Sequence, residues 1–347
     1  MEQQINMTGN FIGKLKNYYI KAKYSLSRMV NFPLVCPDFL QINLTARCNL
    51  QCRICTTYKS PSLIGQELTL VQIKQIVLQA AELGLKRMVL SGGEPFLRND
   101  IFEIVSFIRE NTKMMIIITT NGTLIDPLLA EKIIQAKINH LQVSLDGAID
   151  KTHDFVRGEG AFAKTTDALR ILNKMIKGSL SLGLSFTVTR LNYKEMPSFL
   201  ELGRALGVDD ILFIPLIEDN TYKHEKQIGN KAIFTAKESE EFSLILNEIE
   251  LFQKKYDHPK ITNFDNLFLY AKYFSGALNN QHWLCYAGFH WIQINHNGDM
   301  SMCGWKYASI KGRVLKEIWY SPEARKARVE IKKCRRLCLQ PCMSKPS

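Results

Sequence analysis

The sequence predicts an α/β protein, because strand-like and helix-like segments alternate regularly along its middle part. Six apolar, strand-like segments span residues 39–44, 87–90, 115–119, 140–145, 182–188 and 211–215. Helix-like segments separate them. The best marked of these helices begins after Thr69, a favourable N-cap, and stops at Gly84, a favourable C-cap. This alternation predicts a parallel sheet whose strands are joined by right-handed crossovers.

Polar motifs follow directly after the second, third and fourth predicted strands. Chemistry in barrel-like sheets gathers at the carboxyl ends of the strands, so the position of these motifs indicates a functional site. The motifs are Ser91-Gly92-Gly93-Glu94-Pro95, Thr120-Asn121-Gly122 and Ser144-Leu145-Asp146-Gly147.

Three cysteines follow the first predicted strand with the spacing C-x3-C-x2-C: Cys48, Cys52 and Cys55. Three thiolates can hold three irons of a 4Fe–4S cluster and leave the fourth iron open for a substrate or cofactor. Zinc sites usually need four ligands, commonly arranged as C-x2-C pairs, so this spacing fits zinc less well. The trio therefore predicts an iron–sulfur cluster with one open coordination position.

The cysteine spacing and the Gly92-Gly93-Glu94-Pro95 string together resemble the signature of the radical S-adenosylmethionine (radical SAM) enzymes. The resemblance covers residues 38–216 and implies a partial, TIM-like (β/α)6 barrel. It also implies that the open iron chelates the amino and carboxylate groups of S-adenosylmethionine. Reductive cleavage then gives methionine and a 5′-deoxyadenosyl radical, with a flavodoxin or ferredoxin as the reductant.

The resemblance also assigns cofactor-binding roles. Gly92 and Gly93 let the backbone approach the ligand and leave its polar groups free for the methionine amine. Glu94 adds charge-assisted attraction for that ammonium group. In the family, residues at the positions of Ser144 and Asp146 often contact the ribose or methionine part of the cofactor, although Asp146 also suits an ordinary turn.

Two further residues, Arg157 and Asn121, are also candidates for binding the cofactor. Arg157 resembles a family arginine whose planar guanidinium pairs with the methionine carboxylate; the alternative is a surface arginine in a loop. Asn121, after the third strand, is a cofactor-binding candidate on the same grounds.

A second cysteine group occupies the C-terminal part. Cys285 is followed by twelve residues, Gly298, four residues and Cys303, and the chain closes with Cys334, Cys338 and Cys342. Segments 291–295 and 300–303 flank an Asn-Gly pair, which predicts a β-hairpin. A basic helix is expected from Ser321 and Pro322 to about residue 332.

This second group resembles the SPASM and twitch extensions of radical SAM enzymes. Full SPASM domains carry seven cysteines, and five suffice for one auxiliary 4Fe–4S cluster. We expect the ligands to be Cys285, Cys303, Cys338 and Cys342, with Cys334 as the competing choice; a zinc site is the alternative. Cys36 matches neither group and is expected to be a buried thiol.

Composition places few limits on function. The chain has 347 residues, 46% hydrophobic and 22% charged, as in ordinary globular proteins. No signal peptide or stretch of about 20 apolar residues is evident, so a cytoplasmic location is expected. The net charge of +12 is compatible with an anionic substrate or surface, although a solvated basic exterior is the simpler explanation. Arginine-rich tracts are missing, so no nucleic-acid partner is expected.

Residues 1–35 carry an amphipathic helical pattern with lysines on the polar faces. Such a helix can lie on an anionic membrane surface, but packing of its apolar stripe on the barrel is the favoured interpretation. The apolar positions are Phe11, Ile12, Leu15, Tyr18, Tyr19, Ala22, Leu26 and Met29.

We therefore expect four parts: an N-terminal helix (1–35), a radical SAM partial barrel (36–219), a helical linker (220–280) and a small C-terminal domain of a β-hairpin and helix that binds the auxiliary cluster (281–347). The predicted activity is hydrogen abstraction from a substrate carbon. The outcome is expected to be a two-electron oxidation, or related modification, of a peptide or sugar-derived natural product.

Two alternatives remain open. A carbohydrate epimerase or dehydrogenase would fit the same motifs, and epimerisation would need a hydrogen donor, for which Cys334 or Cys36 is a candidate. The non-enzymatic alternative is an iron–sulfur or zinc-binding electron-transfer protein on a degenerate barrel. No catalytic acid or base is assigned.

Overall fold

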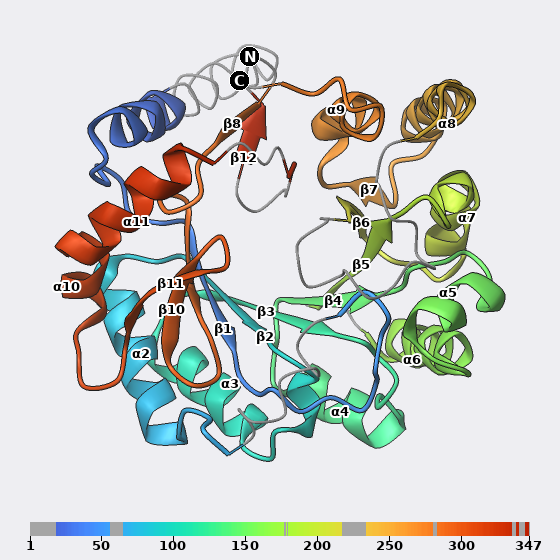
Figure 1. Cartoon of the computed structure of the whole chain (residues 1–347). Coiled ribbons are helices and arrows are strands. Elements are labelled where there is room, and N and C mark those ends of the chain that lie inside the picture. Colours follow the sequence, from blue (N-terminus) through green and yellow to red (C-terminus); the bar gives the residue numbers. More distant parts are fainter. Residues whose placement is uncertain are drawn as a thin grey trace, which may run out of the picture.

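A curved, open sheet of ten strands runs through the protein, and helices cover its outer face (Figure 1). The computed structural model describes residues 19–55, 65–176, 178, 180–216, 234–279, 283–334, 338–339 and 344–346. The strand order is β11-β10-β9-β1-β2-β3-β4-β5-β6-β7, and two further strands, β12 and β8, form a separate small sheet. The predicted partial α/β barrel is therefore confirmed.

The first six strands are parallel to one another and follow chain order across the sheet. All six lie within one or two residues of the segments predicted from the sequence. They are β1 (Phe39–Asn43), β2 (Arg87–Ser91), β3 (Met115–Thr120), β4 (His140–Ser144), β5 (Ser181–Val188) and β6 (Asp210–Pro215).

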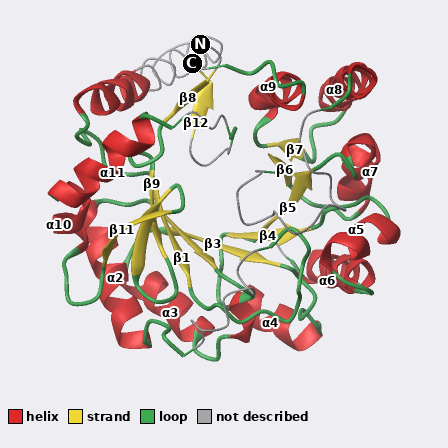
Figure 2. Cartoon of the chain, viewed as in Figure 1, coloured by secondary structure: helices red, strands yellow, loops and turns green. Residues whose placement is uncertain are grey.

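Helices follow the strands and pack on the outside of the sheet (Figure 2). Around the barrel they are α2 (Leu70–Leu83), α3 (Ile101–Asn111), α4 (Pro127–Gln135), α5 (Asp150–Arg157), α6 (Ala161–Met175) and α7 (Met196–Ala205), with short 3-10 turns at Pro95–Leu97 and Tyr193–Glu195. Alternate strand residues such as Leu40 and Ile42 are buried against buried helix residues such as Ile73 and Val77, and this layer forms the hydrophobic core.

Helix α2 has the ends that the sequence predicts. The Thr69 side chain accepts a hydrogen bond from Gln72 N, and the Gln72 side chain accepts one from Thr69 N, which completes a capping box. At the other end Gly84 has φ 92°, a left-handed conformation that glycine adopts without strain.

The predicted C-terminal hairpin is present and continues the barrel sheet. Strand β9 (Trp291–Ile294) pairs in parallel with β1, and β10 (Asp299–Met302) returns antiparallel to it after a turn in which Gly298 has φ 88°. A third strand, β11 (Trp305–Ser309), completes this antiparallel extension. The hairpin and the barrel therefore share one continuous sheet. The domain boundaries expected from the sequence stay predictions.

Side-chain amides reinforce the junction between barrel and hairpin. Asn43 Nδ2 on β1 donates to Asn295 Oδ1 at 3.1 Å, and Asn295 Nδ2 donates to Ser301 Oγ at 3.1 Å. Gln41 Nε2 donates to Asn43 Oδ1, also at 3.1 Å. This chain of hydrogen bonds fixes the C-terminal hairpin on the first barrel strand.

The segment expected to be a helical linker also contributes to the sheet. It contains α8 (Ala236–Lys255) and α9 (Phe264–Phe274), as predicted, but the two-residue strand β7 (Lys260–Ile261) pairs in parallel with β6. No sequence pattern predicts β7, because two residues are too few to establish an alternation of apolar and polar side chains.

The final part of the chain combines short helices with the small sheet. Helices α10 (Leu315–Tyr320) and α11 (Pro322–Lys332) follow β11, and α11 begins at the expected Ser321 cap. Strand β8 (Trp283–Cys285) pairs antiparallel with β12 (Ser344–Pro346), so the chain end lies beside the first auxiliary cysteine.

The N-terminal helix does not pack as predicted. Residues 19–30 are helical, and the buried side chains of this segment are Tyr24 and Ser27. The predicted apolar stripe is solvent-exposed at the positions that the structure describes: Tyr19 is 61%, Leu26 43% and Met29 67% exposed. Packing of this stripe on the barrel is therefore wrong for these residues.

The opposite face of this helix contacts the C-terminal segment. The Tyr24 ring lies edge-on to the rings of Tyr286 and His290, and Arg28 Nε donates to Cys285 O at 3.0 Å. These partners lie more than 250 residues away along the chain, so the helix joins the two ends of the protein. Among the described helices, none combines the length and the apolar character needed to cross a membrane.

Arg328 holds α11 against the turn that leads into β9. Its guanidinium is buried, donates from Nε to Gly288 O at 2.7 Å and from Nη2 to Trp319 O at 2.8 Å, and lies over the Trp319 ring. Burial lowers the pKa of Arg328 to about 10, which still leaves it charged at neutral pH.

We expect Arg328→Ala to lower the free energy of unfolding by about 3 kcal/mol, because it leaves two buried carbonyls without their charged donor. Arg325→Ala, at an exposed position of the same helix, is the matched control and should change it by less than about 0.5 kcal/mol. Anaerobic urea unfolding measures both values. Equal stability of the two variants would contradict the role given to Arg328.

Candidate cluster and cofactor site

The three N-terminal cysteines lie on the loop that follows β1, at the carboxyl edge of the sheet. Cys52 is buried, and Cys48 and Cys55 are half-buried. Burial raises the pKa of the Cys52 thiol to about 11, and the nearby Cys55 and Cys48 add to this effect while Arg157 opposes it. The three thiols therefore lie on one short loop, near enough to influence one another's pKa.

The gathered thiols are not arranged as ligands of a single ion. Within the described ranges, no group of three or more His, Cys, Asp or Glu side chains is placed to hold one metal ion. Thiolates that bind a 4Fe–4S cluster each attach to a different iron, so they do not converge on one atom. Three thiols on one short loop suit such a cluster by their number and chemistry.

The glycine turn after β2 packs directly on the start of the cysteine loop. Gly93 N donates to Thr45 O and Glu94 N to Arg47 O, both at 2.8 Å. A Cβ on Gly93 would lie 2.0 Å from Arg47 O, and one on Gly92 would lie 2.5 Å from Thr45 O. Only glycine permits this approach.

These two N–H groups bind the cysteine loop because the pairing between β1 and β2 continues past the ends of both strands, so the turn's donors meet the carbonyls of residues 45 and 47. An ammonium group needs acceptors rather than donors, so the expected role of the turn toward the methionine amine stays a prediction.

Glu94 is completely buried and joins the ends of β2 and β3. Its Oε1 accepts from Thr120 Oγ1 at 2.8 Å and from Phe96 N at 3.2 Å, and its Oε2 accepts from Asn121 N at 2.9 Å. Burial raises the pKa of Glu94, and these hydrogen bonds oppose the increase. In this arrangement the carboxylate positions the two motif turns.

Asn121 connects the third strand to the cysteine loop. Its Nδ2 donates to Asn49 Oδ1 at 2.9 Å and reaches Cys48 Sγ at 3.9 Å. Its Oδ1 accepts from Thr123 N at 2.9 Å, which fixes the orientation of the amide. The structure therefore places this predicted residue beside a predicted cluster ligand.

Asp146 and Arg157 form a buried ion pair next to the cysteines. Arg157 Nε donates to Asp146 Oδ2 at 2.7 Å, and Asp146 Oδ1 accepts from Thr187 N at 2.7 Å. Burial alone would lower the pKa of Arg157, but Asp146, Cys52 and Cys55 together raise it. Arg157 therefore lies on the last turn of α5 beside the cysteines, and the alternative of a solvated surface arginine is wrong.

Helix α5 also holds the cysteine loop directly. Arg53 N donates to Val156 O at 2.8 Å, and the Arg53 guanidinium lies 4.3 Å from the centre of the Phe155 ring. Ser144, the remaining predicted residue, is half-buried at the end of β4, where Ser185 Oγ lies 3.4 Å from its hydroxyl. The seven predicted cofactor residues thus line the ends of β2, β3 and β4 and the end of α5.

Sequence reasoning missed two residues that support Asp146. His153 Nδ1 accepts from Asp146 N at 3.0 Å, and Asn192 Nδ2 donates to Asp146 O at 2.9 Å. Burial lowers the pKa of His153 to about 4, so the ring is neutral near pH 7 and its Nδ1 can accept. Neither residue belongs to a motif that follows one of the predicted strands, so the sequence alone does not indicate that the fold brings them to this turn.

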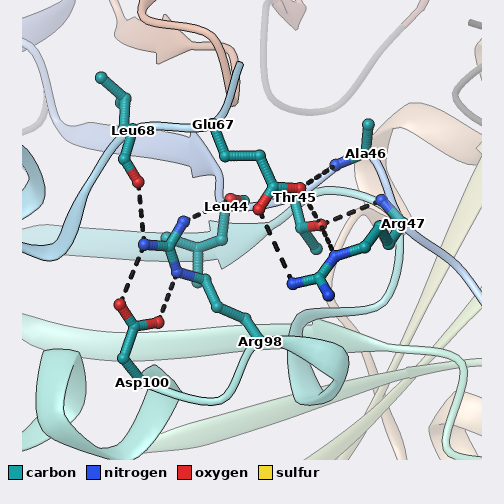
Figure 3. A network of polar contacts seen from close by, with 8 residues as sticks. All are labelled: Leu44, Thr45, Ala46, Arg47, Glu67, Leu68, Arg98 and Asp100. Carbon is teal, nitrogen blue, oxygen red and sulfur yellow. Dashed lines mark hydrogen bonds and ion pairs between the residues drawn. The ribbon is translucent and has the colours of Figure 1, made fainter. Parts of the chain in front are cut away.

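A buried charge network, also missed, anchors the strand end before the cysteines (Figure 3). Arg98 donates to Leu44 O and Leu68 O, both at 2.9 Å, and pairs with Asp100. Glu67 Oε1 accepts from Ala46 N at 3.2 Å and from the Thr45 hydroxyl. The only sequence signal was the place of Arg98, four residues after Glu94.

The C-terminal cysteines gather in part. Burial raises the pKa of Cys285 to about 11, and the nearby Cys338 and Cys334 add to this effect. Cys303 lies directly after β10 in a left-handed conformation with φ 52°. Cys342 lies outside the described residues, so the choice between it, Cys334 and the other expected ligands stays a prediction.

Two family descriptions match the chain. Residues 42–203 match the Radical SAM superfamily, and residues 285–343 match SPASM, an iron–sulfur cluster-binding domain. The chain therefore carries a radical SAM domain followed by a SPASM domain. The radical SAM domain implies a 4Fe–4S cluster and S-adenosylmethionine as cofactors. The SPASM domain binds iron–sulfur clusters, so the C-terminal cysteines are assigned to auxiliary iron–sulfur binding and not to zinc.

Curated relatives share about half of their length with this chain. An AdoMet-dependent heme synthase from Methanosarcina barkeri is 36% identical over 172 residues, which are 49% of this chain and 48% of that protein. A PqqA peptide cyclase from Granulibacter bethesdensis is 33% identical over 172 residues, 49% of this chain and 45% of that protein.

Solved structures share the fold over nearly the whole chain. Streptococcus suis SuiB bound to precursor peptide SuiA superposes with a TM-score of 0.70 at 18% identity, covering 91% of this chain and 71% of that one. Native anSMEcpe with bound AdoMet and Cp18Cys peptide gives a TM-score of 0.64 at 20% identity, with coverages of 87% and 88%.

We expect Glu94→Ala to lower the free energy of unfolding by about 3 kcal/mol, because three donors lose their buried acceptor. Glu94→Gln should cost less, since its carboxamide oxygen still accepts. The matched control is the exposed Glu82→Ala, which should be neutral. Anaerobic urea unfolding of the reconstituted protein measures the free energy of unfolding of each variant. We expect the largest loss for Glu94→Ala, a smaller loss for Glu94→Gln and no change for Glu82→Ala. A Glu94→Ala variant as stable as the wild type would refute the role given to Glu94.

Proposed function

We propose that Cys48, Cys52 and Cys55 hold the catalytic cluster and that the enzyme removes a hydrogen atom from a substrate carbon in a net two-electron oxidation. The observation that carries the proposal is the fixation of the cysteine loop on three sides. The glycine turn binds it through Arg47 O, Asn121 binds Asn49, and α5 binds Arg53. A loop held in this way presents its thiols in one geometry.

When bound, the cluster supplies the electron that splits S-adenosylmethionine into methionine and a 5′-deoxyadenosyl radical. The chain's own residues would position the reactants. Arg157, held by Asp146, is the cation beside the cysteines and suits the methionine carboxylate. Ser144, at the end of β4, would contact the polar part of the cofactor. Glu94 positions the turns that approach this site rather than standing open to it.

A ribosomal peptide is the substrate class that we favour. SuiB, bound to a precursor peptide, and anSMEcpe, bound to a peptide, both share the fold across the barrel and the C-terminal region. A relative named PqqA peptide cyclase adds sequence similarity over half of the chain. Transfer of deuterium from a labelled candidate peptide to 5′-deoxyadenosine would test this choice.

A tetrapyrrole side chain is the second candidate. The relatives named AdoMet-dependent heme synthase and Fe-coproporphyrin III synthase are 36% and 35% identical over about half of this chain. That similarity lies within half of the chain, whereas the peptide-bound structures superpose over about nine-tenths of it. Deuterium transfer from a labelled porphyrin, and none from peptides, would favour this candidate.

Replacing Cys52 with alanine should abolish formation of 5′-deoxyadenosine, because two thiolates cannot retain the open cluster. Anaerobically reconstituted wild-type protein is expected to bind about eight irons, and the variant about four. Dithionite and S-adenosylmethionine start the assay, and chromatography measures the product. Cys36→Ala is the matched control: this thiol matches neither cysteine motif, donates to Leu83 O at 3.1 Å and is half-buried rather than buried as expected. Product formation by Cys52→Ala would overturn the assignment.

Replacing Cys303 with alanine should separate the two clusters. We expect iron to fall to about four per chain while 5′-deoxyadenosine is still formed without substrate, because only the auxiliary site loses a ligand. The same measurement on Cys334→Ala decides whether that residue is a ligand. Unchanged iron in Cys303→Ala would exclude Cys303 from the cluster.

A further inference from the structure

The exposed apolar stripe of the N-terminal helix is not used by the proposed function. Tyr19, Leu26 and Met29 are exposed, and Val30 at the end of the helix is 43% exposed. Phe32, which follows the helix, is 44% exposed and also packs on the Tyr320 ring at 5.4 Å between centroids. Several exposed apolar side chains on one helix are typical of an interaction surface.

The opposite face of the helix already packs on the protein, so the exposed stripe is not needed to hold the helix in place. Tyr24 and Ser27 are buried, and Tyr24 contacts Tyr286 and His290. Residues 22, 26 and 29 follow the helical spacing of one face, opposite to Tyr24.

The charge around the stripe is strongly positive. Residues 1–35 contain five basic residues and one acidic residue, Glu2. Lys21, Lys23 and Arg28 are on the described part of the helix, and Lys332 of α11 donates to Met29 O at 3.2 Å, beside the stripe. Figure 1 shows this helix at the periphery, next to α11. Apolar residues flanked by lysines fit the surface of an anionic lipid bilayer.

We propose that this face docks the enzyme on an anionic membrane surface. The apolar side chains enter the boundary between headgroups and acyl chains, and the lysines contact the anionic headgroups. The helix lies in the plane of the interface, and the remainder of the protein stays outside the bilayer. Docking and the proposed reaction are separate proposals, because the contacts of the helix that anchor it are with the C-terminal segment, at Tyr286, His290 and Cys285.

The test is flotation of the reconstituted full-length protein with phosphatidylcholine vesicles that contain or lack phosphatidylglycerol. We expect binding to the anionic vesicles that falls with added salt, and at least about tenfold weaker binding to the neutral ones. The double variant Leu26→Gln/Met29→Gln should bind at least about tenfold more weakly than wild type. Lys21→Gln/Lys23→Gln should bind several-fold more weakly and with a smaller salt dependence.

The matched control is Leu128→Gln/Leu251→Gln, which removes two leucines that are 71% and 64% exposed on α4 and α8. It should bind vesicles like wild type. Every variant should retain its iron content and its formation of 5′-deoxyadenosine without vesicles, so failure of docking and failure of the proposed reaction are distinguished.

Three outcomes would overturn the proposal. The first is no binding to anionic vesicles. The second is equal binding by wild type and Leu26→Gln/Met29→Gln, which would mean that charge alone attracts the protein. The third is a concentration-dependent dimer that this double variant abolishes, without vesicle binding, since the stripe would then be covered by a second copy of the chain.

Discussion

The contact between two backbone segments, residues 45–47 before the cysteines and the glycine turn after β2, is the constraint on which the site depends. A side chain on Gly93 would overlap Arg47 O, so the approach exists only because both turn residues are glycines. Through this contact the parallel pairing of β1 and β2 continues past their ends. The cysteine loop therefore leaves the sheet in one fixed direction.

Buried charges stabilise that arrangement from both sides. Glu94 and Asp146 are fully buried, yet Glu94 accepts from the Asn121 N–H of the next turn, and Asp146 accepts from Thr187 N on β5 and is paired with Arg157. Burial of a carboxylate is costly unless it is paired in this way, so these residues specify how the turns meet. The same arrangement leaves Arg157 beside the thiols, where it offsets part of the negative charge of thiolates.

The sequence predicted the strands, the α2 caps and the hairpin because these depend on local patterns. It predicted which residues gather at the site because parallel strands bring their carboxyl ends together. It did not reveal which segment the glycines contact, because a glycine pair shows only that no side chain stands in the way of a close approach. The support given by Arg98, Glu67 and His153 depends on contacts between distant segments, and charged residues in a sequence carry no sign of their burial.

Strand direction relates the two cysteine groups to each other. Strand β9 runs parallel to β1 with Trp291 opposite Phe39, and β10 returns antiparallel, so Cys303 lies at the amino edge of the sheet. Cys285 precedes β9, and Asp38 N donates to His290 O at 2.7 Å beside that same edge. Cys48, in contrast, follows β1 at the carboxyl edge. Five strand residues span about 17 Å. The two cysteine groups therefore lie at opposite edges of the same sheet, about one strand length apart.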